Sequence, residues 1–283
     1  GTASIIVCNH QSMLDSAVFM ALSPKTILIS NSKVSRNKVI RKIYQWNGFI
    51  TLDDKNAIND ALIKDYIAHG YSLVVFPEGK RNDRSTISRF HKGAFLLAER
   101  YGLDIQPLII HGLNVVLPRN SFQVFTGSIT VKGYERVRQD GHTTYSEMTS
   151  RVHAFYKKEY ERLAREIEKA AYFAPLVEDR YCYKGVEIYR SVHKNIKRNE
   201  SFTRWIDTSE ALSAVLIKNN DHGEFALLYA LVHPSTLVTV LEEDESKRAL
   251  LTYCAKGIAD NLQVTDHVDM KEAEEAGIKI ISL

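Results

Sequence analysis

The chain has 283 residues, of which 45% are hydrophobic and 25% are charged, and its formal net charge is +3. These values are typical of a globular protein, and so small a charge argues against nucleic acid as a partner. No apolar run reaches the roughly 18 residues of a membrane-spanning helix. The length suits one large domain or two modest ones.

Two short apolar runs in the first half of the chain, residues 4–8 and 71–76, are predicted to be buried strands. Each leads into a polar block, Asn9–Asp15 and Phe76–Arg81 respectively. Ligands of open α/β sheets gather where strands end, so these blocks are the predicted site. The other elements expected in this half are helices at 13–22, 34–46, 54–69 and 90–101 and strands at 26–30, 105–110, 122–125 and 128–134.

The first block holds an imidazole and a carboxylate five positions apart, His10 and Asp15. On one continuous helix they would point to different faces, so we expect His10 in a turn and Asp15 in the first turn of a helix that begins near Ser12. Imidazole exchanges protons near neutral pH, and a carboxylate fixes its tautomer. The alternative is that Asp15 only caps a helix and His10 is an ordinary turn residue.

The second block is a turn rich in charge. Pro77 and Gly79 favour a turn directly after the strand. Glu78 lies in it, and Lys80, Arg81 and Arg84 follow closely. Clustered basic side chains and free backbone N–H groups bind anions such as phosphate, although a solvated loop has the same composition.

Together, the two blocks resemble the signatures of the glycerolipid acyltransferase family, His-x4-Asp and Phe-Pro-Glu-Gly-x-Arg, in that order. Gly48–Asp53 and Ile105–Ile110 resemble further blocks of the same family, and the likeness covers roughly residues 3–140. It implies an α/β fold with a mixed sheet flanked by helices, assigned to residues 1–142. Only eight residues precede Asn9, whereas family members usually have a membrane-associated segment there, so we expect the chain to be part of a longer protein.

The resemblance implies transfer of a fatty acyl group from acyl-CoA or acyl carrier protein to a hydroxyl of a lysophospholipid or related lipid precursor. His10 would be the general base and Asp15 would orient it, while Glu78, Gly79 and Arg81 would position the acceptor with Ser12 and Lys80. Neither a metal nor another cofactor is needed. Where family members often have an arginine, this chain has Asp54 and Lys55, which leaves open whether the acceptor carries a phosphate.

Basic residues dominate the start of the chain. Residues 1–50 hold Asp15 as their one acid and six bases, Lys25, Lys33, Arg36, Lys38, Arg41 and Lys42. Apolar side chains are interleaved with these bases, a pattern typical of peripheral contact with anionic lipid and equally of a solvated helix that packs on a core. Cys8, Cys182 and Cys254 show no metal-ligand spacing and indicate a reducing compartment. We therefore expect a cytoplasmic protein on the inner face of the cell membrane.

The second half of the chain has a different pattern of predicted elements. A long amphipathic helix at 144–173, ended by Ala174-Pro175, occupies most of a predicted linking segment, 143–184. Residues 185–283 then alternate strands (212–217, 237–241, 262–265 and 278–281) with helices (224–232, 246–255 and 271–276). This alternation predicts a smaller Rossmann-like domain with a parallel βαβ sheet.

The opening of this second domain resembles S-adenosylmethionine-dependent methyltransferases. Its turn, Lys218–Gly223, has one glycine where the pattern has several, and we interpret the domain as degenerate. Glu243 is the candidate ribose ligand. A second hypothesis is therefore a binding or docking module that recognises S-adenosylmethionine, a nucleotide or a protein partner, with an inactive first domain.

Overall fold

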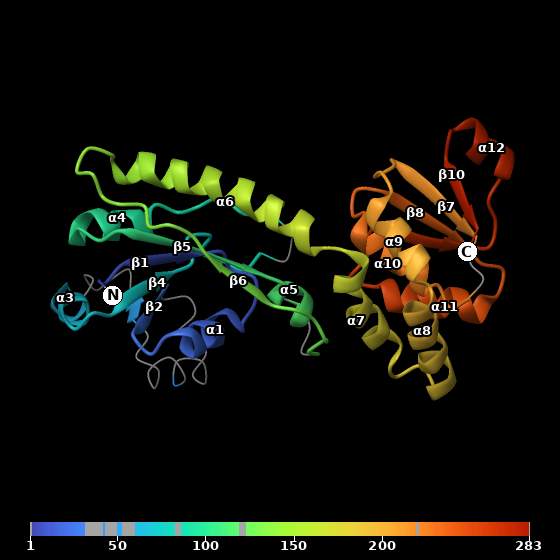
Figure 1. Cartoon of the computed structure of the whole chain (residues 1–283), viewed down its shortest axis with the longest axis horizontal. Coiled ribbons are helices and arrows are strands. Elements are labelled where there is room, and N and C mark those ends of the chain that lie inside the picture. Colours follow the sequence, from blue (N-terminus) through green and yellow to red (C-terminus); the bar gives the residue numbers. More distant parts are fainter. Residues whose placement is uncertain are drawn as a thin grey trace. The chain divides into compact units, whose positions relative to one another are not determined.

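The computed structural model describes residues 2–31, 42, 50–52, 60–82, 86–118, 123–218 and 221–282. The chain divides into two compact units (Figure 1). Unit 1 comprises residues 1–124 and 128–164, and unit 2 comprises residues 125–127 and 165–283.

Unit 1 is built on a mixed sheet, as expected from the sequence. Within its described residues six strands pair in the order β3-β2-β4-β1-β5-β6. Their bounds are β1 (Ile5–Cys8), β2 (Thr26–Asn31), β3 (Ile50–Leu52), β4 (Ser72–Val75), β5 (Ile105–His111) and β6 (Thr130–Gly133). Only the β5–β6 pair is antiparallel among them. Because β1 and β4 are parallel neighbours, the two polar blocks that follow them meet at one edge of the sheet.

Helices cover both faces of this sheet. They are α1 (Asp15–Leu22), α3 (Asp60–Ala68), α4 (Gly93–Tyr101), α5 (Leu113–Val116) and α6 (Tyr145–Ile167). α1 lies on one face and α4 and α6 lie on the other (Figure 1). Phe19 of α1 packs on Ile6, Cys8, Leu28, Val74 and Ile110. On the face covered by α6, the Tyr156 hydroxyl donates to the carbonyl of Val7. Val7 is paired in the sheet with Pro107 of β5, which has no N–H to donate.

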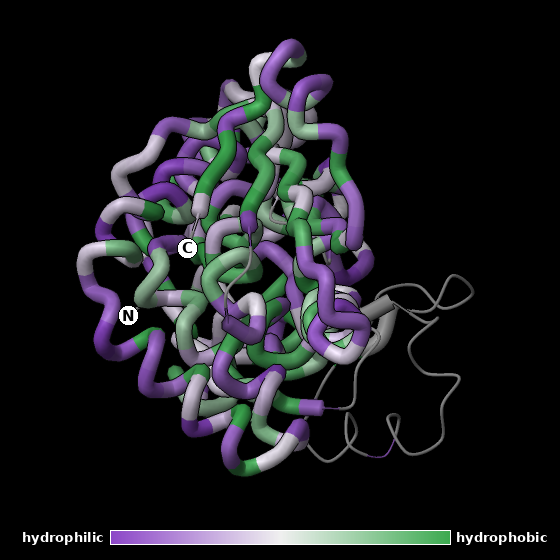
Figure 2. Tube along the Cα trace, turned by 90° about the vertical axis from the view of Figure 1, so that its right-hand side faces the viewer, coloured by the Kyte–Doolittle hydropathy of each residue, from purple (hydrophilic) through white to green (hydrophobic). Residues whose placement is uncertain are grey.

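Unit 2 contains a parallel sheet with strand order β10-β7-β8-β9. The strands are β7 (Ala214–Lys218), β8 (Leu237–Leu241), β9 (Leu262–Thr265) and β10 (Lys279–Ser282). The helices are α7 (Ala170–Tyr181), α8 (Val186–Arg198), α9 (Glu200–Thr208), α10 (Glu224–Val232), α11 (Glu245–Ala255) and α12 (Met270–Glu275). Hydrophobic stretches run along the strands, and hydrophilic stretches lie on the segments around them (Figure 2). The predicted strands and the helices between them are confirmed; α8 and α9 were not predicted.

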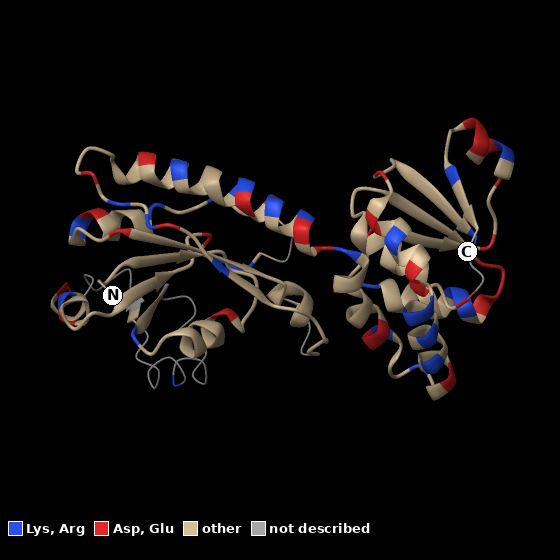
Figure 3. Cartoon of the chain, viewed as in Figure 1, with Lys and Arg blue, Asp and Glu red and all other residues tan. Residues whose placement is uncertain are grey.

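The long helix expected at 144–173 is two helices in the structure. α6 ends at Ile167 and α7 begins at Ala170 after Lys169, so the predicted linking segment 143–184 is divided between the two units. Charged residues recur along α6, whereas the strands carry few (Figure 3). The predicted helix end at Pro175 is wrong. Pro175 lies inside α7, where burial of Phe173, Leu176, Val177 and Tyr181 holds the helix together despite the missing N–H.

Two further predictions concern a strand at 122–125 and a basic helix at 34–46. The strand expected at 122–125 is absent from its described part, residues 123–125. Phe125 instead packs in unit 2, with the Arg180 guanidinium 5.5 Å from its ring. The basic helix at 34–46, apart from Lys42, and the departure at Asp54 and Lys55 lie outside the described residues, as do Arg84 and the half of Gly48–Asp53 that is not in β3.

Candidate active site

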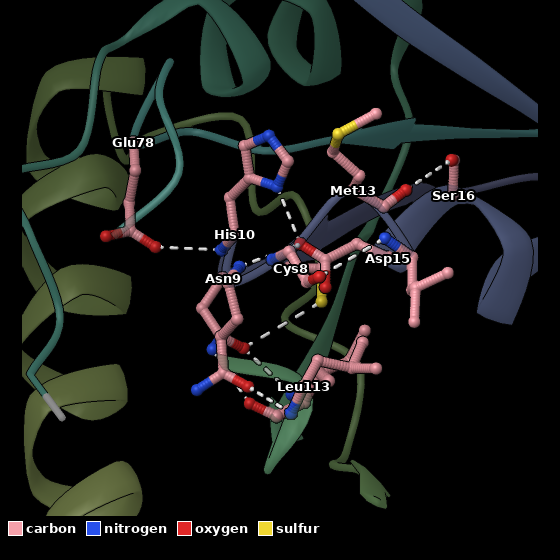
Figure 4. Close-up of polar contacts among 12 residues, drawn as sticks. Cys8, Asn9, His10, Met13, Asp15, Ser16, Glu78 and Leu113 are labelled. Atoms are coloured by element: carbon pink, nitrogen blue, oxygen red, sulfur yellow. Dashed lines mark hydrogen bonds and ion pairs between the residues drawn. The ribbon is translucent and has the colours of Figure 1, made fainter. Parts of the chain in front are cut away.

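The imidazole of His10 and the carboxylate of Asp15 are in direct contact. His10 lies in the turn after β1, and Asp15 is the first residue of α1. Nδ1 of His10 is 2.6 Å from Oδ2 of Asp15 (Figure 4). The same oxygen accepts the backbone N–H groups of Gln11, at 2.7 Å, and of Ser12, at 3.1 Å. Asp15 therefore orients His10, and the alternative in which it only caps a helix is wrong.

This contact determines which nitrogen of the ring is available. A carboxylate beside Nδ1 places the proton there, which leaves the lone pair on Nε2. None of the described residues makes a hydrogen bond to Nε2, and the side chain is 24% exposed. The ring of Phe76 stacks on the imidazole with centroids 4.4 Å apart. The ring is thus fixed by one nitrogen and one face, while the other nitrogen is open to a substrate.

The start of α1 differs partly from the expected capping box. The helix begins at Asp15 and not at Ser12, and its N-cap is Leu14. The Asp15 carboxylate does reach back to the Ser12 N–H, but the Ser12 hydroxyl donates to the carbonyl of Leu117, at 3.1 Å. Ser12 is 1% exposed, so its hydroxyl stabilises the turn through a hydrogen bond in the protein interior.

Glu78 joins the two polar blocks through backbone donors. Its Oε1 accepts the N–H of His10 at 2.9 Å (Figure 4). Its Oε2 accepts the N–H of Ser88, also at 2.9 Å. In the same region, the N–H of Asn82 donates to the carbonyl of His10 at 2.8 Å. Burial raises the pKa of Glu78 above its ordinary value. Glu78 therefore holds the His10 turn in place, a role that the sequence did not suggest; its contact with an acceptor stays a prediction.

Glu78→Ala is expected to lower the free energy of unfolding by about 1–3 kcal/mol, because two partly buried N–H groups lose their acceptor. Relief of the buried carboxylate offsets part of this loss. Urea unfolding of wild type and variant measures the difference. Glu135→Ala, which removes an exposed carboxylate of the same unit, is the control with an expected change below about 0.5 kcal/mol. Equal midpoints for all three proteins would contradict the role given to Glu78.

The turn after Glu78 requires the glycine that the sequence provides. Gly79 has φ +67°, and a Cβ there would lie 3.0 Å from Cδ2 of His91. Its N–H donates to the carbonyl of Phe76, and the N–H of His91 donates to the carbonyl of Pro77. A larger residue would meet both backbone strain and the His91 ring.

Lys80 and Arg81 follow this turn. Lys80 is exposed and Arg81 is half-buried, and neither side chain bonds to another of the described residues. Arg81 directly precedes Asn82, whose N–H is bonded to His10. The Arg81 guanidinium therefore lies in the segment whose backbone is bonded to His10. Its N–H groups are available to bind an anion.

Three further side-chain contacts connect the first polar block, Asn9–Asp15, to β5, α5 and α6. The side-chain amide of Asn9 pairs with both the N–H and the carbonyl of Ile110, each at 2.8 Å. The Gln11 side chain donates to the Tyr160 hydroxyl of α6 at 2.7 Å and accepts the N–H of Leu113. Sequence reasoning missed Tyr160. The available signal was the spacing of Tyr156 and Tyr160, one helical turn apart on the face of α6 that is buried.

A cavity of about 130 Å³ lies beside α1. Apolar Phe19, Met20, Pro24, Leu28 and Val74 line it together with the hydroxyl residues Ser16, Ser23 and Thr26. Phe19 makes an edge contact with Phe76, and Phe76 stacks on His10. The Phe76 ring therefore lies between the imidazole of His10 and the Phe19 ring that lines the cavity. Within the described parts of the chain, no three His, Cys, Asp or Glu side chains are grouped to hold a metal ion. No helix in those parts is long and apolar enough to cross a membrane.

Comparison with known proteins gives a consistent assignment. Residues 1–111 match the family described as Acyltransferase. The chain is 27% identical over 163 residues to a 1-acyl-sn-glycerol-3-phosphate acyltransferase of Cocos nucifera, covering 55% of this chain and 53% of the relative. To the enzyme of that name from Helicobacter pylori it is 29% identical over 170 residues, 57% of this chain and 71% of the relative.

Among solved structures, the 1-acyl-sn-glycerophosphate acyltransferase PlsC from Thermotoga maritima aligns with a TM-score of 0.49 and 22% identity, over 57% of this chain and 66% of that one. The chain spans about half the length of the Cocos nucifera relative. Residues 1–111, which contain both signature blocks that the fold brings to one sheet edge, therefore match the Acyltransferase family, and the relatives with which the chain aligns are 1-acyl-sn-glycerol-3-phosphate acyltransferases.

Proposed function

We propose that the chain is an O-acyltransferase that moves a fatty acyl group from a thioester, acyl-CoA or acyl carrier protein, to the free hydroxyl of a lysophospholipid. The observation that carries this proposal is the His10–Asp15 pair, in which Nδ1 is held and Nε2 is open. The names of the relatives support a 1-acylglycerol-3-phosphate type of acceptor.

In this mechanism Nε2 of His10 takes the proton of the acceptor hydroxyl as its oxygen attacks the thioester carbonyl. Asp15 stabilises the imidazolium that forms. The tetrahedral intermediate collapses with cleavage of the carbon–sulfur bond, and the imidazolium returns the proton to the thiolate. An ester and a free thiol result, and no acyl group is attached to the protein.

Arg81 is proposed to bind the phosphate of the acceptor. Arg81→Ala is expected to raise KM for 1-acylglycerol-3-phosphate about 10- to 100-fold with a smaller effect on kcat, because a charge-assisted hydrogen bond contributes about 1.5–3 kcal/mol. Initial rates over a range of acceptor concentrations measure this.

Two comparisons make the Arg81 test specific. With a monoacylglycerol, which has no phosphate, wild type and Arg81→Ala should give the same KM. Arg89→Ala removes an exposed arginine in the segment before α4 and should leave KM for the phosphate-bearing acceptor unchanged. An equal rise in KM for both acceptors would contradict phosphate recognition by Arg81.

The outer surface of α1 suits a lipid substrate. Met20 and Leu22 of α1 and Met13, just before it, are 51%, 55% and 55% exposed, and Met20 also lines the cavity. Exposed apolar side chains close to an active site favour contact with a lipid surface. We therefore include peripheral membrane contact in the proposal, with the acyl chain entering the cavity next to Phe19.

A further inference from the structure

Unit 2 has a topological switch point that is defined by its strand order. From β7 the chain passes through α10 to β8 and through α11 to β9, both on one side of β7. It then returns through α12 to β10, which pairs with β7 on the other side. In open parallel sheets ligands bind at the carboxyl ends of two such strands, in the crevice where the strand order reverses. Here these ends are Lys218 and Ser282, which are paired in register.

A cavity of about 350 Å³ is found at this point. It is lined by Ser282 at the end of β10, by Asp221 in the turn after β7, by Phe225 in the first turn of α10, and by Asn199, Phe202 and Trp205 of α9 and its cap. Its volume lies within the roughly 300–1,000 Å³ of small-molecule sites. Four separate segments of unit 2 therefore converge on one cavity at the edge where a ligand is expected.

The cavity combines aromatic rings with polar side chains at its opening. Phe202 lies 5.0 Å from Phe225 and 5.2 Å from Trp205, centroid to centroid. Asn199, Asp221 and Ser282 are exposed. The Asn199 carbonyl oxygen caps α9 by accepting the Phe202 N–H, so its NH2 group remains to donate to a ligand.

These groups favour a planar ring with hydroxyl substituents. Aromatic side chains stack on heterocycles, with contributions of about 1–3 kcal/mol per base in nucleic-acid sites. A carboxylate, a hydroxyl and an amide supply acceptors and donors for ring nitrogens and sugar hydroxyls. Among the described residues that line the cavity Asp221 is the charged one, and the ammonium of Lys279 lies 5.6 Å from the centre of the Trp205 ring, so one carboxylate and one cation are close to a bound ligand.

The crevice on the other side of β7 is arranged differently. Gly223 has φ +85°, and a Cβ at this position would lie 2.5 Å from Cδ2 of Leu251. This glycine lets α11 pack closely, and the Leu251 side chain occupies the space through which a ligand would approach the turn. The candidate ribose ligand Glu243, which follows β8, is not among the residues that line the cavity.

We propose that this cavity is a nucleoside site, in which the base packs against Phe202 beside the edge of Trp205. The site belongs to unit 2 alone, and it is independent of the acyl-transfer chemistry assigned to unit 1.

Tryptophan fluorescence tests this directly, because the chain has two tryptophans, Trp46 and Trp205. In a Trp46→Phe background of the full chain the emission reports Trp205. Titration with adenosine, guanosine, cytidine and uridine to about 5 mM should change this emission for at least one of them, with Kd below about 1 mM. No change with any of the four would overturn the proposal.

Steric variants locate the site. Ser282→Phe and Ser201→Phe place a ring in the cavity at two exposed positions, and each should weaken binding at least about tenfold. Glu243→Phe, the matched control, adds the same ring at an exposed position after β8 and should change Kd by less than about twofold. Loss of binding in Glu243→Phe with retention in both serine variants would place the ligand in the β7–β8 crevice and would overturn the assignment.

Discussion

His10→Ala is expected to lower kcat for acyl transfer about 10³-fold, which is within the range for loss of a general base. The reason is geometric: the variant loses the one nitrogen that is both oriented by Asp15 and open to an acceptor hydroxyl. Release of free thiol from acyl-CoA in the presence of 1-acylglycerol-3-phosphate measures kcat. Because His10 is the side-chain partner of the buried Asp15 carboxylate and stacks on Phe76, the variant is also expected to lose stability, so kcat is compared per folded molecule.

A second histidine–aspartate pair on unit 1 supplies the matched control. Nδ1 of His69 lies 3.4 Å from Oδ1 of Asp65, and both side chains are well exposed on and after α3. His69→Ala should retain wild-type kcat. A kcat within about threefold of wild type for His10→Ala would exclude His10 as the base.

Asp15→Asn is expected to lower kcat about 10²- to 10⁴-fold, chiefly through the protonation state of His10. An asparagine carries no charge to stabilise the imidazolium. If its NH2 group faces Nδ1, the ring proton moves to Nε2 and removes the lone pair that accepts the substrate proton. Because Asp15 is fully buried and also accepts two backbone N–H groups, a loss of stability accompanies the loss of rate. The rate is therefore compared per folded molecule, with thermal unfolding of the same preparation.

The pH profile separates positioning from folding in Asp15→Asn. If Asp15 acts through His10, the pH dependence of kcat per folded molecule should differ between the variant and wild type. Asp65→Asn, which changes the exposed pair, should keep both the rate and the profile. An Asp15→Asn protein with a wild-type profile and a proportional loss of folded material would reduce Asp15 to a structural role.

The sequence predicted the site well where side chains carry the signal. Both signature blocks follow apolar runs, and β1 and β4 are indeed adjacent, so His10 and Arg81 lie in segments that are bonded to each other. The role of Glu78 could not be predicted, because its partners are backbone N–H groups, which every residue except proline has. Tyr160 is 149 positions from Gln11, and their contact exists only because α6 lies along the sheet.

Unit 2 shows a different limit of sequence reasoning. Its strands and the helices between them follow from alternation of apolar and polar segments, but strand order does not. Sequence proximity directed attention to the turn after β7 and to Glu243 after β8. The cavity lies on the other side of β7, because the last strand in the sequence, β10, is its neighbour in the sheet. Helices α8 and α9 were missed although both are strongly amphipathic: Val192 and Ile196, one turn apart, and Ile206 are buried, while the opposite faces are charged.

The most direct test of the central claim is product analysis by mass spectrometry. Purified chain is mixed with palmitoyl-CoA and an 18-carbon 1-acylglycerol-3-phosphate, alongside the His10→Ala protein. We expect wild type to form the mixed diacylglycerol phosphate in step with free CoA, and the variant to form almost none. Formation of the diacyl product at equal rates by both proteins, or release of CoA by wild type without any diacyl product, would contradict acyl transfer by His10.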